Sequence, residues 1–477
     1  MKFVLGKRRG PPRTPRAKTL RQDLHRCTLD GLFYCLMVGL AEMYLAKFAV
    51  DLGLGPVAAG LIATVPVLLA AALALSGPKL LKRVGSFPKY IGIVAGLQGL
   101  MLAPLAAVAV AAPFVLPRMK EAGLTWVATA TVFILVTLYY FGAIATAAPW
   151  ITIVGAIIPA RLRANYNAHR LRLLQAATLA ALLAHGLIAD GVQRAWNAWP
   201  ALARTGLDPV LCGFAIAFCI AGACRLASAW HLSKYSEPPD PPSGQAHIHA
   251  TDFFRRFRHG NDGRFLLYAL AGNCALQVAQ PYFNPFMLGQ IRFSGSIHSF
   301  LIAHIGAQAP YSVLLAAVYL GRILVLPLAG RIAQRRGGTP LLWIGGLALP
   351  PMALFWLFTA DYGLLLLGQI ATGAALAIWE LGLFLMNYEA IKPSERTAMI
   401  TYYTLINESS KTSGSLVGGW TLGALGKDQH AYAVVFYISA AMRVLTLLLL
   451  ARVGGGGRPT EAKATAEAKE QTAGVAG

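Results

Sequence analysis

The run TWVATATVFILVTLYYFGAIATAAPWITIVGAII, residues 125–158, contains no charged side chain over 34 residues. A helix that crosses the hydrocarbon core of a bilayer needs about 20 consecutive apolar residues, because its backbone polar groups must be satisfied within the segment. This run is too long for one straight crossing, so we expect a bend near Pro149 or an extension into the cytoplasm. It marks the chain as an all-α membrane protein.

Further apolar runs of similar length follow the same pattern, and together they predict twelve transmembrane helices. The predicted crossings are Leu29 to Val50, Val57 to Leu75, Tyr90 to Val110, Thr125 to Ile144, Asn167 to Ile188, Pro209 to His231, Phe265 to Leu288, Gln308 to Leu328, Leu341 to Phe358, Tyr362 to Met386, Ala398 to Leu422 and Ala431 to Val453.

The composition agrees with this assignment. The 477 residues are 56% hydrophobic and only 13% charged, yet the formal net charge is +22. A strongly basic chain can bind nucleic acid, but that needs a soluble domain with a basic face, and no such domain is visible. No short apolar core with a small-residue cleavage site precedes Leu29, so we expect no removable signal peptide.

The basic residues also predict the topology, since Lys and Arg collect in cytoplasmic loops. Counting outward from a cytoplasmic N-terminus places the basic loops inside and leaves loops of mixed charge outside. The inside loops carry Lys79, Lys82, Arg83 and Lys89, then Arg161, Arg163, Arg170 and Arg172, then Arg255, Arg256, Arg258 and Arg264, then Arg331, Arg335 and Arg336, and finally Lys392 and Arg396. Both termini are therefore predicted to be cytoplasmic.

The longest polar connection, Ser233 to Gly263, divides the helices into six before and six after. The predicted organisation is a basic cytoplasmic tail at residues 1–28, a six-helix bundle at 29–232, a cytoplasmic linker at 233–263, a second six-helix bundle at 264–453 and a disordered tail at 454–477.

Metal and disulfide chemistry are not expected. The six cysteines mostly lie in apolar runs without a C-x-x-C pair, so we interpret them as small buried hydrophobic residues. The linker contains an H-x-H pair, His247 and His249, which is too small a set to predict a metal site. No cofactor is predicted.

Weak self-similarity links the two halves. The sixth helix reads Phe218, Ile220, Ala223, Arg225, and the twelfth has the same four residue types at the same spacing, at Phe436, Ile438, Ala441 and Arg443. After the second and eighth helices, Arg83-x-Gly85 corresponds to Arg335-x-Gly337.

These loops resemble the major facilitator superfamily, whose motif reads Gly, three residues, Asp, Arg, one residue, Gly. Residues 330–337 reproduce that spacing with Gly330, Arg335 and Gly337, while the first-half copy has Pro78 at the Gly position, followed by Arg83 and Gly85. Lys82 and Gln334 stand where the family has Asp, so the resemblance carries over no carboxylate for locking the inner gate. We interpret the following residues as gating loops: Lys82, Arg83, Gly85, Gly330, Gln334, Arg335 and Gly337.

A second resemblance, to a poorly characterised bacterial branch of that superfamily, lies in the segment from Ala147 to Arg170, with Trp150 and Pro159, and in the Trp379-Glu380 pair. The resemblance implies two six-helix bundles around a central cavity that opens alternately to each side of the inner membrane. It implies a small-molecule substrate, membrane lipid as the surroundings and a monomer.

Glu42 is the first candidate functional residue, because charge inside a membrane helix is costly and marks a functional site by default. It lies near or just beyond the middle of the first predicted helix. Its carboxylate could couple transport to protons or contact substrate. A structural ion pair or a polar contact with a neighbouring helix is an equally good interpretation.

The eleventh predicted helix holds the most polar intramembrane run, from Asn407 to Ser413. Glu408 and Lys411 are three residues apart and can neutralise each other on one helix face, beside Asn407. Such a run should line the cavity or pack between helices.

Three further residues, Asn273, Gln277 and Glu380, complete the candidate set of seven. Asn273 and Gln277 form a polar stripe in the seventh helix, ahead of a predicted bend at Pro281. Glu380 in the tenth helix and Arg322 in the eighth could contact substrate or form a salt bridge with each other.

We considered three classes of function. The first is a secondary transporter, which is either proton-coupled or a uniporter. A membrane enzyme is not expected, since H-E-x-x-H, G-x-S-x-G and a phosphate-binding Gly-rich loop are all missing from the sequence. A receptor or assembly partner on a transporter scaffold is the third, because fold does not fix function.

Overall fold

The computed structural model describes residues 15–54, 62, 65–238, 248, 250–283, 286–287, 290–304, 309–426 and 428–453. The predicted disordered tail at 454–477 and the His247 and His249 pair lie outside these residues. The longer helices are α1 (Pro15–Leu40), α4 (Val65–Ala74), α5 (Gly77–Val84), α6 (Phe87–Leu100), α7 (Leu102–Glu121), α8 (Thr125–Ile157), α9 (Ala160–Ala198), α11 (Pro209–Ser233), α12 (Ala250–His259), α13 (Asn261–Ala279), α15 (Ser296–His304), α16 (Ala309–Arg336), α17 (Thr339–Leu354), α18 (Tyr362–Glu389), α19 (Arg396–Leu425) and α20 (Gln429–Leu450).

The fold is all-helical, as predicted. Within the described residues, nine helices are long and apolar enough to cross a membrane, and the bent pair α4 and α5 makes a tenth candidate. Helices α13 and α19 are also long enough to cross, at 19 and 30 residues, but they are more polar than these ten. Helix α13 carries the predicted polar stripe of the seventh crossing, and α19 carries the polar run of the eleventh. These two helices account for the difference between the ten apolar candidates and the twelve predicted crossings.

The long apolar run at 125–158 forms one continuous helix, α8, with Pro149 inside it. Its 33 residues span about 50 Å at 1.5 Å per residue, well beyond a hydrocarbon core of about 30 Å. The helix is therefore longer than one straight crossing needs, and the bend near Pro149 or the cytoplasmic extension stays a prediction. Helix α1 likewise begins at Pro15, before the first predicted crossing, so part of the basic N-terminal arm is helical.

The chain forms two compact units. The first contains residues 1–159, 170–250 and 393–413, and the second contains 160–169, 251–392 and 414–477. Each unit therefore includes a short segment from the other half of the sequence: the first turns of α9 belong to the second unit, and the first half of α19 belongs to the first unit.

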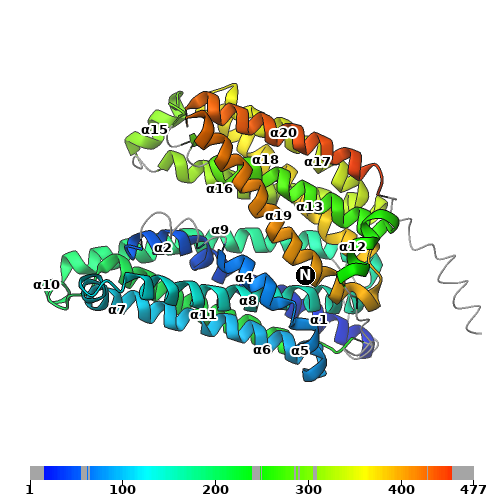
Figure 1. The fold of residues 1–477 in the computed structure, drawn as a ribbon, viewed down its shortest axis with the longest axis horizontal. Coiled ribbons are helices and arrows are strands. Elements are labelled where there is room, and N and C mark those ends of the chain that lie inside the picture. Colours follow the sequence, from blue (N-terminus) through cyan, green and yellow to red (C-terminus); the bar gives the residue numbers. More distant parts are fainter. Residues whose placement is uncertain are drawn as a thin grey trace, which may run out of the picture. The chain divides into compact units, whose positions relative to one another are not determined.

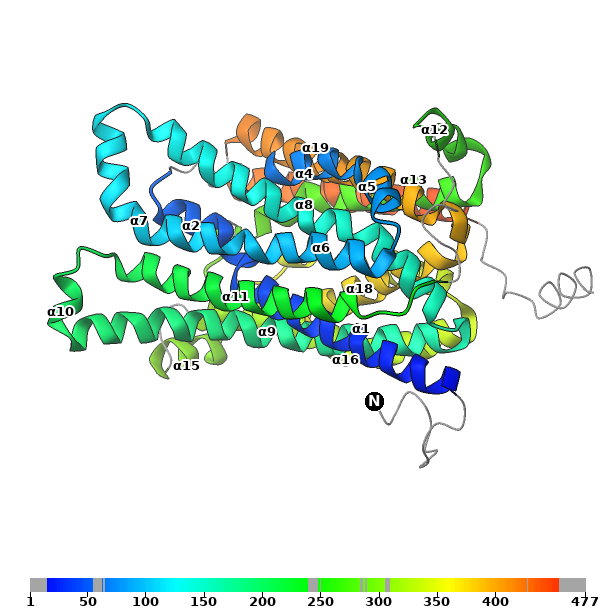
Figure 2. The same ribbon diagram turned by 90° about the horizontal axis from the view of Figure 1, so that it is seen from below.

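The two units repeat one order of helix packing. In the first, α1 packs on α11, α11 on α6, α6 on α8 and α8 on α4; in the second, α13 packs on α20, α20 on α17, α17 on α18 and α18 on α16. Figures 1 and 2 show these neighbours, for example α6 beside α11. Helices at equivalent places in the two halves of the sequence thus take equivalent places in the two units.

The repeated arginines occupy equivalent positions in this arrangement. Arg225 of α11 is 3% exposed and donates to Gln98 of α6 at 2.7 Å. Arg443 of α20 is 6% exposed and donates to the Leu349 carbonyl of α17 at 2.8 Å. Each guanidinium thus joins the sixth helix of its unit to the third. Nε of Arg443 has no hydrogen-bond partner in the described part of the chain.

Two glycines bring α16 and α18 into backbone contact. A Cβ added to Gly321 would fall on the Ile370 carbonyl oxygen, and one added to Gly373 would fall on the Val318 carbonyl oxygen. The contact is reciprocal, so both helices depend on the absence of a side chain. Small residues allow this close approach of helices in lipid, where packing drives association.

We predict that Gly321→Ala and Gly373→Ala each lower the free energy of unfolding by about 1–3 kcal/mol, the usual cost of overpacking. Gly423→Ala on α19 is the matched control, since an added Cβ there meets nothing within 4 Å. It should be neutral or stabilising by up to about 1 kcal/mol, because Ala favours helix more than Gly. Thermal unfolding in detergent measures all three; equal midpoints for Gly321→Ala and Gly423→Ala would contradict the packing argument.

Candidate functional site

Glu42 lies at a break in the first membrane helix. Helix α1 ends at Leu40, the 3₁₀ turn η1 occupies Glu42–Tyr44, and α2 resumes at Leu45–Asp51. The Tyr44 amide donates to the Ala41 carbonyl at 3.0 Å instead of continuing the α-helical pattern to Leu40. The half-buried Glu42 carboxylate accepts a hydrogen bond from Tyr139 of α8 at 2.8 Å.

The break leaves the Leu40 carbonyl without its helical donor, and His185 of α9 forms a hydrogen bond with this carbonyl. Its Nδ1 lies 2.7 Å from the Leu40 carbonyl oxygen, so Nδ1 carries the proton and donates. The Tyr44 ring stacks on the His185 imidazole at 3.6 Å between centroids, and its hydroxyl donates to the Leu182 carbonyl at 3.1 Å. The break is thus a built feature with its backbone group satisfied by a partner helix.

No ion pair neutralises Glu42 in the described residues of the first unit. Arg225 acts on it electrostatically, but the guanidinium donates to Gln98 and Ser228 and covers the Tyr34 ring at 4.8 Å. The structural alternatives for Glu42 were an ion pair and a polar contact with a neighbouring helix. The ion pair is absent from this part of the chain. The polar contact is the single hydrogen bond from Tyr139.

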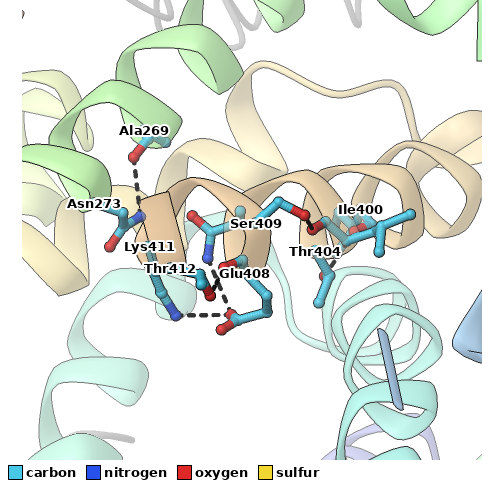
Figure 3. A network of polar contacts seen from close by, with 10 residues as sticks. Ala269, Asn273, Ile400, Thr404, Glu408, Ser409, Lys411 and Thr412 are labelled. Atoms are coloured by element: carbon cyan, nitrogen blue, oxygen red, sulfur yellow. Dashed lines mark hydrogen bonds and ion pairs between the residues drawn. The ribbon is translucent and has the colours of Figure 1, made fainter. Parts of the chain in front are cut away.

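The polar run of α19 forms the predicted intrahelical pair. Lys411 Nζ lies 2.8 Å from Glu408 Oε1, and Asn407 Nδ2 donates to the same oxygen at 3.3 Å. Figure 3 shows Glu408 and Lys411 on one side of the α19 ribbon. The first unit therefore holds four of the seven predicted residues: Glu42, Asn407, Glu408 and Lys411.

The other three residues belong to the second unit. Glu380 forms a two-pronged salt bridge with Arg322, at 2.6 and 3.0 Å, which joins α18 to α16 next to their glycine contact. Asn273 donates to the Ala269 carbonyl of its own helix at 2.9 Å, and Gln277 is half-buried one turn further on. Helix α13 ends at Ala279 and a 3₁₀ turn containing Pro281 follows, where the bend was predicted.

The residues of the predicted gating loops lie mostly in the last turns of α5 and α16. Gly85 and Gly337 end α5 and α16 with φ of +72° and +80°, a conformation that favours glycine, and each amide closes the last helical turn. Lys82, Arg83 and Arg335 are exposed on the last turns of these helices. The residues Gly330 to Arg336 are therefore helical, because α16 continues to Arg336 instead of ending near Leu328.

Gln334 stands where the major facilitator motif has Asp, and it makes an uncharged contact there. Its side-chain oxygen accepts from Asn165 at 2.5 Å, and its amide lies 3.5 Å from the Arg161 carbonyl oxygen. A Cβ on Gly330 would overlap Ala168. The start of α9 thus packs on the end of α16 through an amide pair and a close glycine contact, within the second unit.

A buried charge cluster was missed by the sequence interpretation. Asp30 of α1 is 4% exposed; Arg170 of α9, 7% exposed, lies 3.6 Å from its Oδ1. Arg170 also donates to the Cys27 carbonyl and lies over the Trp150 ring. Tyr235 donates to Asp30 Oδ2, and burial followed by the Asp30 charge raises the pKa of Tyr235, which keeps the phenol protonated as a donor.

No protein-family model matches the chain, and no curated protein sequence matches it. Solved structures do match its fold. The fucose:proton symporter of E. coli is 12% identical with a TM-score of 0.61, covering 91% of this chain and 99% of that one. A proton:xylose symporter is 14% identical with a TM-score of 0.61, covering 92% and 97%. A human organic anion transporter is 14% identical with a TM-score of 0.57, covering 92% and 100%.

The chain thus has the fold of major facilitator superfamily transporters over nine-tenths of its length, in agreement with the resemblance at its loop motifs. It is a multi-pass membrane protein with a transporter fold, and the structures it matches are transporters and not enzymes. These matches are similar in fold only, since their sequence identity is low.

Proposed function

We propose that the protein is a secondary active transporter that moves a small organic solute across a bacterial cytoplasmic membrane by alternating access. Glu42 couples this movement to protons. The matched structures include two proton symporters and an organic anion transporter, so they support a transporter without deciding the solute. The remaining predicted residues, including Asn273 and Gln277, are proposed to contact solute.

The observation that supports coupling is the placement of Glu42. It lies at a break in a membrane helix and accepts one hydrogen bond, from Tyr139. A carboxyl group can hold or release a proton there without breaking an ion pair. Broken helices commonly form ion and substrate sites in transporters, because their termini and freed carbonyls face polar ligands.

Exchange in proteoliposomes tests transport itself. The full chain is reconstituted, vesicles are loaded with unlabelled members of a solute panel, and entry of the labelled form is measured against empty vesicles. We expect exchange of at least one solute. A receptor or assembly partner on this scaffold would give no exchange for any solute, and a uniporter would exchange solute without responding to a proton gradient.

The proposed topology places both termini in the cytoplasm. Lys79, at the start of α5, and Arg204, between α10 (Pro200–Ala203) and α11, are both exposed. In a background without native cysteines, Lys79→Cys should react with a membrane-impermeant maleimide only in inside-out vesicles, and Arg204→Cys only in intact cells. Labelling of both from one side would refute the topology.

A further inference from the structure

The polar face of α19 offers hydroxyl oxygens that accept hydrogen bonds, and its charged donor is Lys411, which pairs with Glu408. Thr404 donates its hydroxyl proton to the Ile400 carbonyl at 2.8 Å, and Thr412 donates to the Glu408 carbonyl at 2.9 Å (Figure 3). A hydroxyl has one proton and two lone pairs. Once the proton is used within the helix, each of these oxygens can only accept.

Asn407 adds a buried acceptor without a partner. The residue is 7% exposed, and its Nδ2 is used on Glu408. Its Oδ1 has no hydrogen-bond partner in the described part of the chain. A buried polar atom left unpaired costs about 1–3 kcal/mol, so a ligand that donates to it recovers that energy.

The charges of this face cancel. Glu408 Oε1 receives both Lys411 and Asn407, which leaves Oε2 without a hydrogen bond among the described residues. An anionic ligand would bring further acceptors against Asn407 Oδ1 and Glu408. A cationic ligand would be repelled by Lys411, which lies three residues after Glu408 on the same face and already pairs with it.

We propose that the solute is a neutral, hydroxyl-rich molecule of the polyol or sugar class, whose hydroxyl groups donate to Asn407 Oδ1 and Glu408 Oε2. This assignment rests on the transporter function proposed above and specifies its substrate class. It is based on the unpaired acceptor of Asn407 and on the mutual pairing of Glu408 with Lys411, and it predicts that organic anions and amines are not the main substrate.

A series of ligands that share a carbon skeleton and differ in charge tests the proposal. Binding of sorbitol, glucose, gluconate and glucosamine, with the shorter pair xylitol and xylonate, is measured on the purified full chain by thermal shift in detergent. We expect at least one neutral member to bind, and at least about tenfold more tightly than its carboxylate or amine analogue, since one unpaired buried group costs roughly that factor. Tightest binding by gluconate, xylonate or glucosamine would overturn the proposal, as would no binding by any neutral member.

Variants at Asn407 test the contact. Asn407→Leu removes the acceptor and should weaken binding of the neutral ligand at least about tenfold. Asn407→Ser restores an accepting oxygen and should bind more tightly than Asn407→Leu. Ser409→Ala is the matched control, because Ser409 is exposed and donates to the Leu405 carbonyl. Unchanged binding in a folded, monodisperse Asn407→Leu protein would refute the role of Asn407.

The outcomes separate the two proposals. Transport of an anion with no binding of neutral polyols refutes the substrate class and leaves the transporter intact. Polyol binding without exchange in proteoliposomes keeps the ligand class and refutes transport.

Discussion

Replacing Glu42 with glutamine is expected to abolish proton-driven accumulation of the solute while exchange of the same solute continues. Glutamine is isosteric and its amide oxygen can still accept from Tyr139, so the helix break keeps its hydrogen bond. It cannot release a proton. Exchange should stay within about threefold of wild type, equivalent to about 0.65 kcal/mol, whereas gradient-driven uptake should fall to the level of empty vesicles.

Glu121→Gln provides the matched control for this change, because Glu121 is exposed at the end of α7. It should leave both activities unchanged. Glu408→Gln tests the second carboxylate by the same pair of measurements. If Glu42→Gln and Glu408→Gln both leave gradient-driven uptake at the wild-type level, proton coupling through these carboxylates is wrong.

The largest effect on stability is expected at Asp30 and Arg170. Removing one partner of a buried ion pair leaves an uncompensated charge, which costs about 3–5 kcal/mol. Arg170→Met strands the Asp30 carboxylate, and Asp30→Leu strands the guanidinium, so each should lower the free energy of unfolding by that amount. Their contact is long, at 3.6 Å, but both side chains are almost fully buried.

The double variant Asp30→Leu/Arg170→Met should recover much of the loss, because it removes both charges together. Thermal unfolding in detergent measures the cycle of four proteins. Additive losses would show that the two residues act independently and that the pair is not a structural unit.

The sequence predicted the membrane fold well because that fold depends on local composition. Apolar runs of sufficient length, basic loops and turn glycines such as Gly85 and Gly337 are all visible in short windows. The pairing of Glu408 with Lys411 was also predictable, since residues three apart on a helix are neighbours.

Contacts between distant segments were less predictable, although the salt bridge between Glu380 and Arg322 was one of the two interpretations of those residues. Asp30 lies one residue after the predicted start of the first helix, and Arg170 was assigned to a basic loop, so nothing local linked them. The break at Glu42 has no proline or glycine in residues 41–44 to mark it. Its only sequence signal is a carboxylate in an apolar run, which identified the residue and not the distorted backbone.

In the proposed mechanism, solute movement carries protons through Glu42. The direct measurement is the internal pH of proteoliposomes that contain a trapped pH-sensitive dye, recorded while a transported solute is added outside without an imposed gradient. We expect a solute-dependent pH change with wild-type protein and none with Glu42→Gln. Solute entry with no pH change in the wild type, or the same pH change in Glu42→Gln, would contradict it.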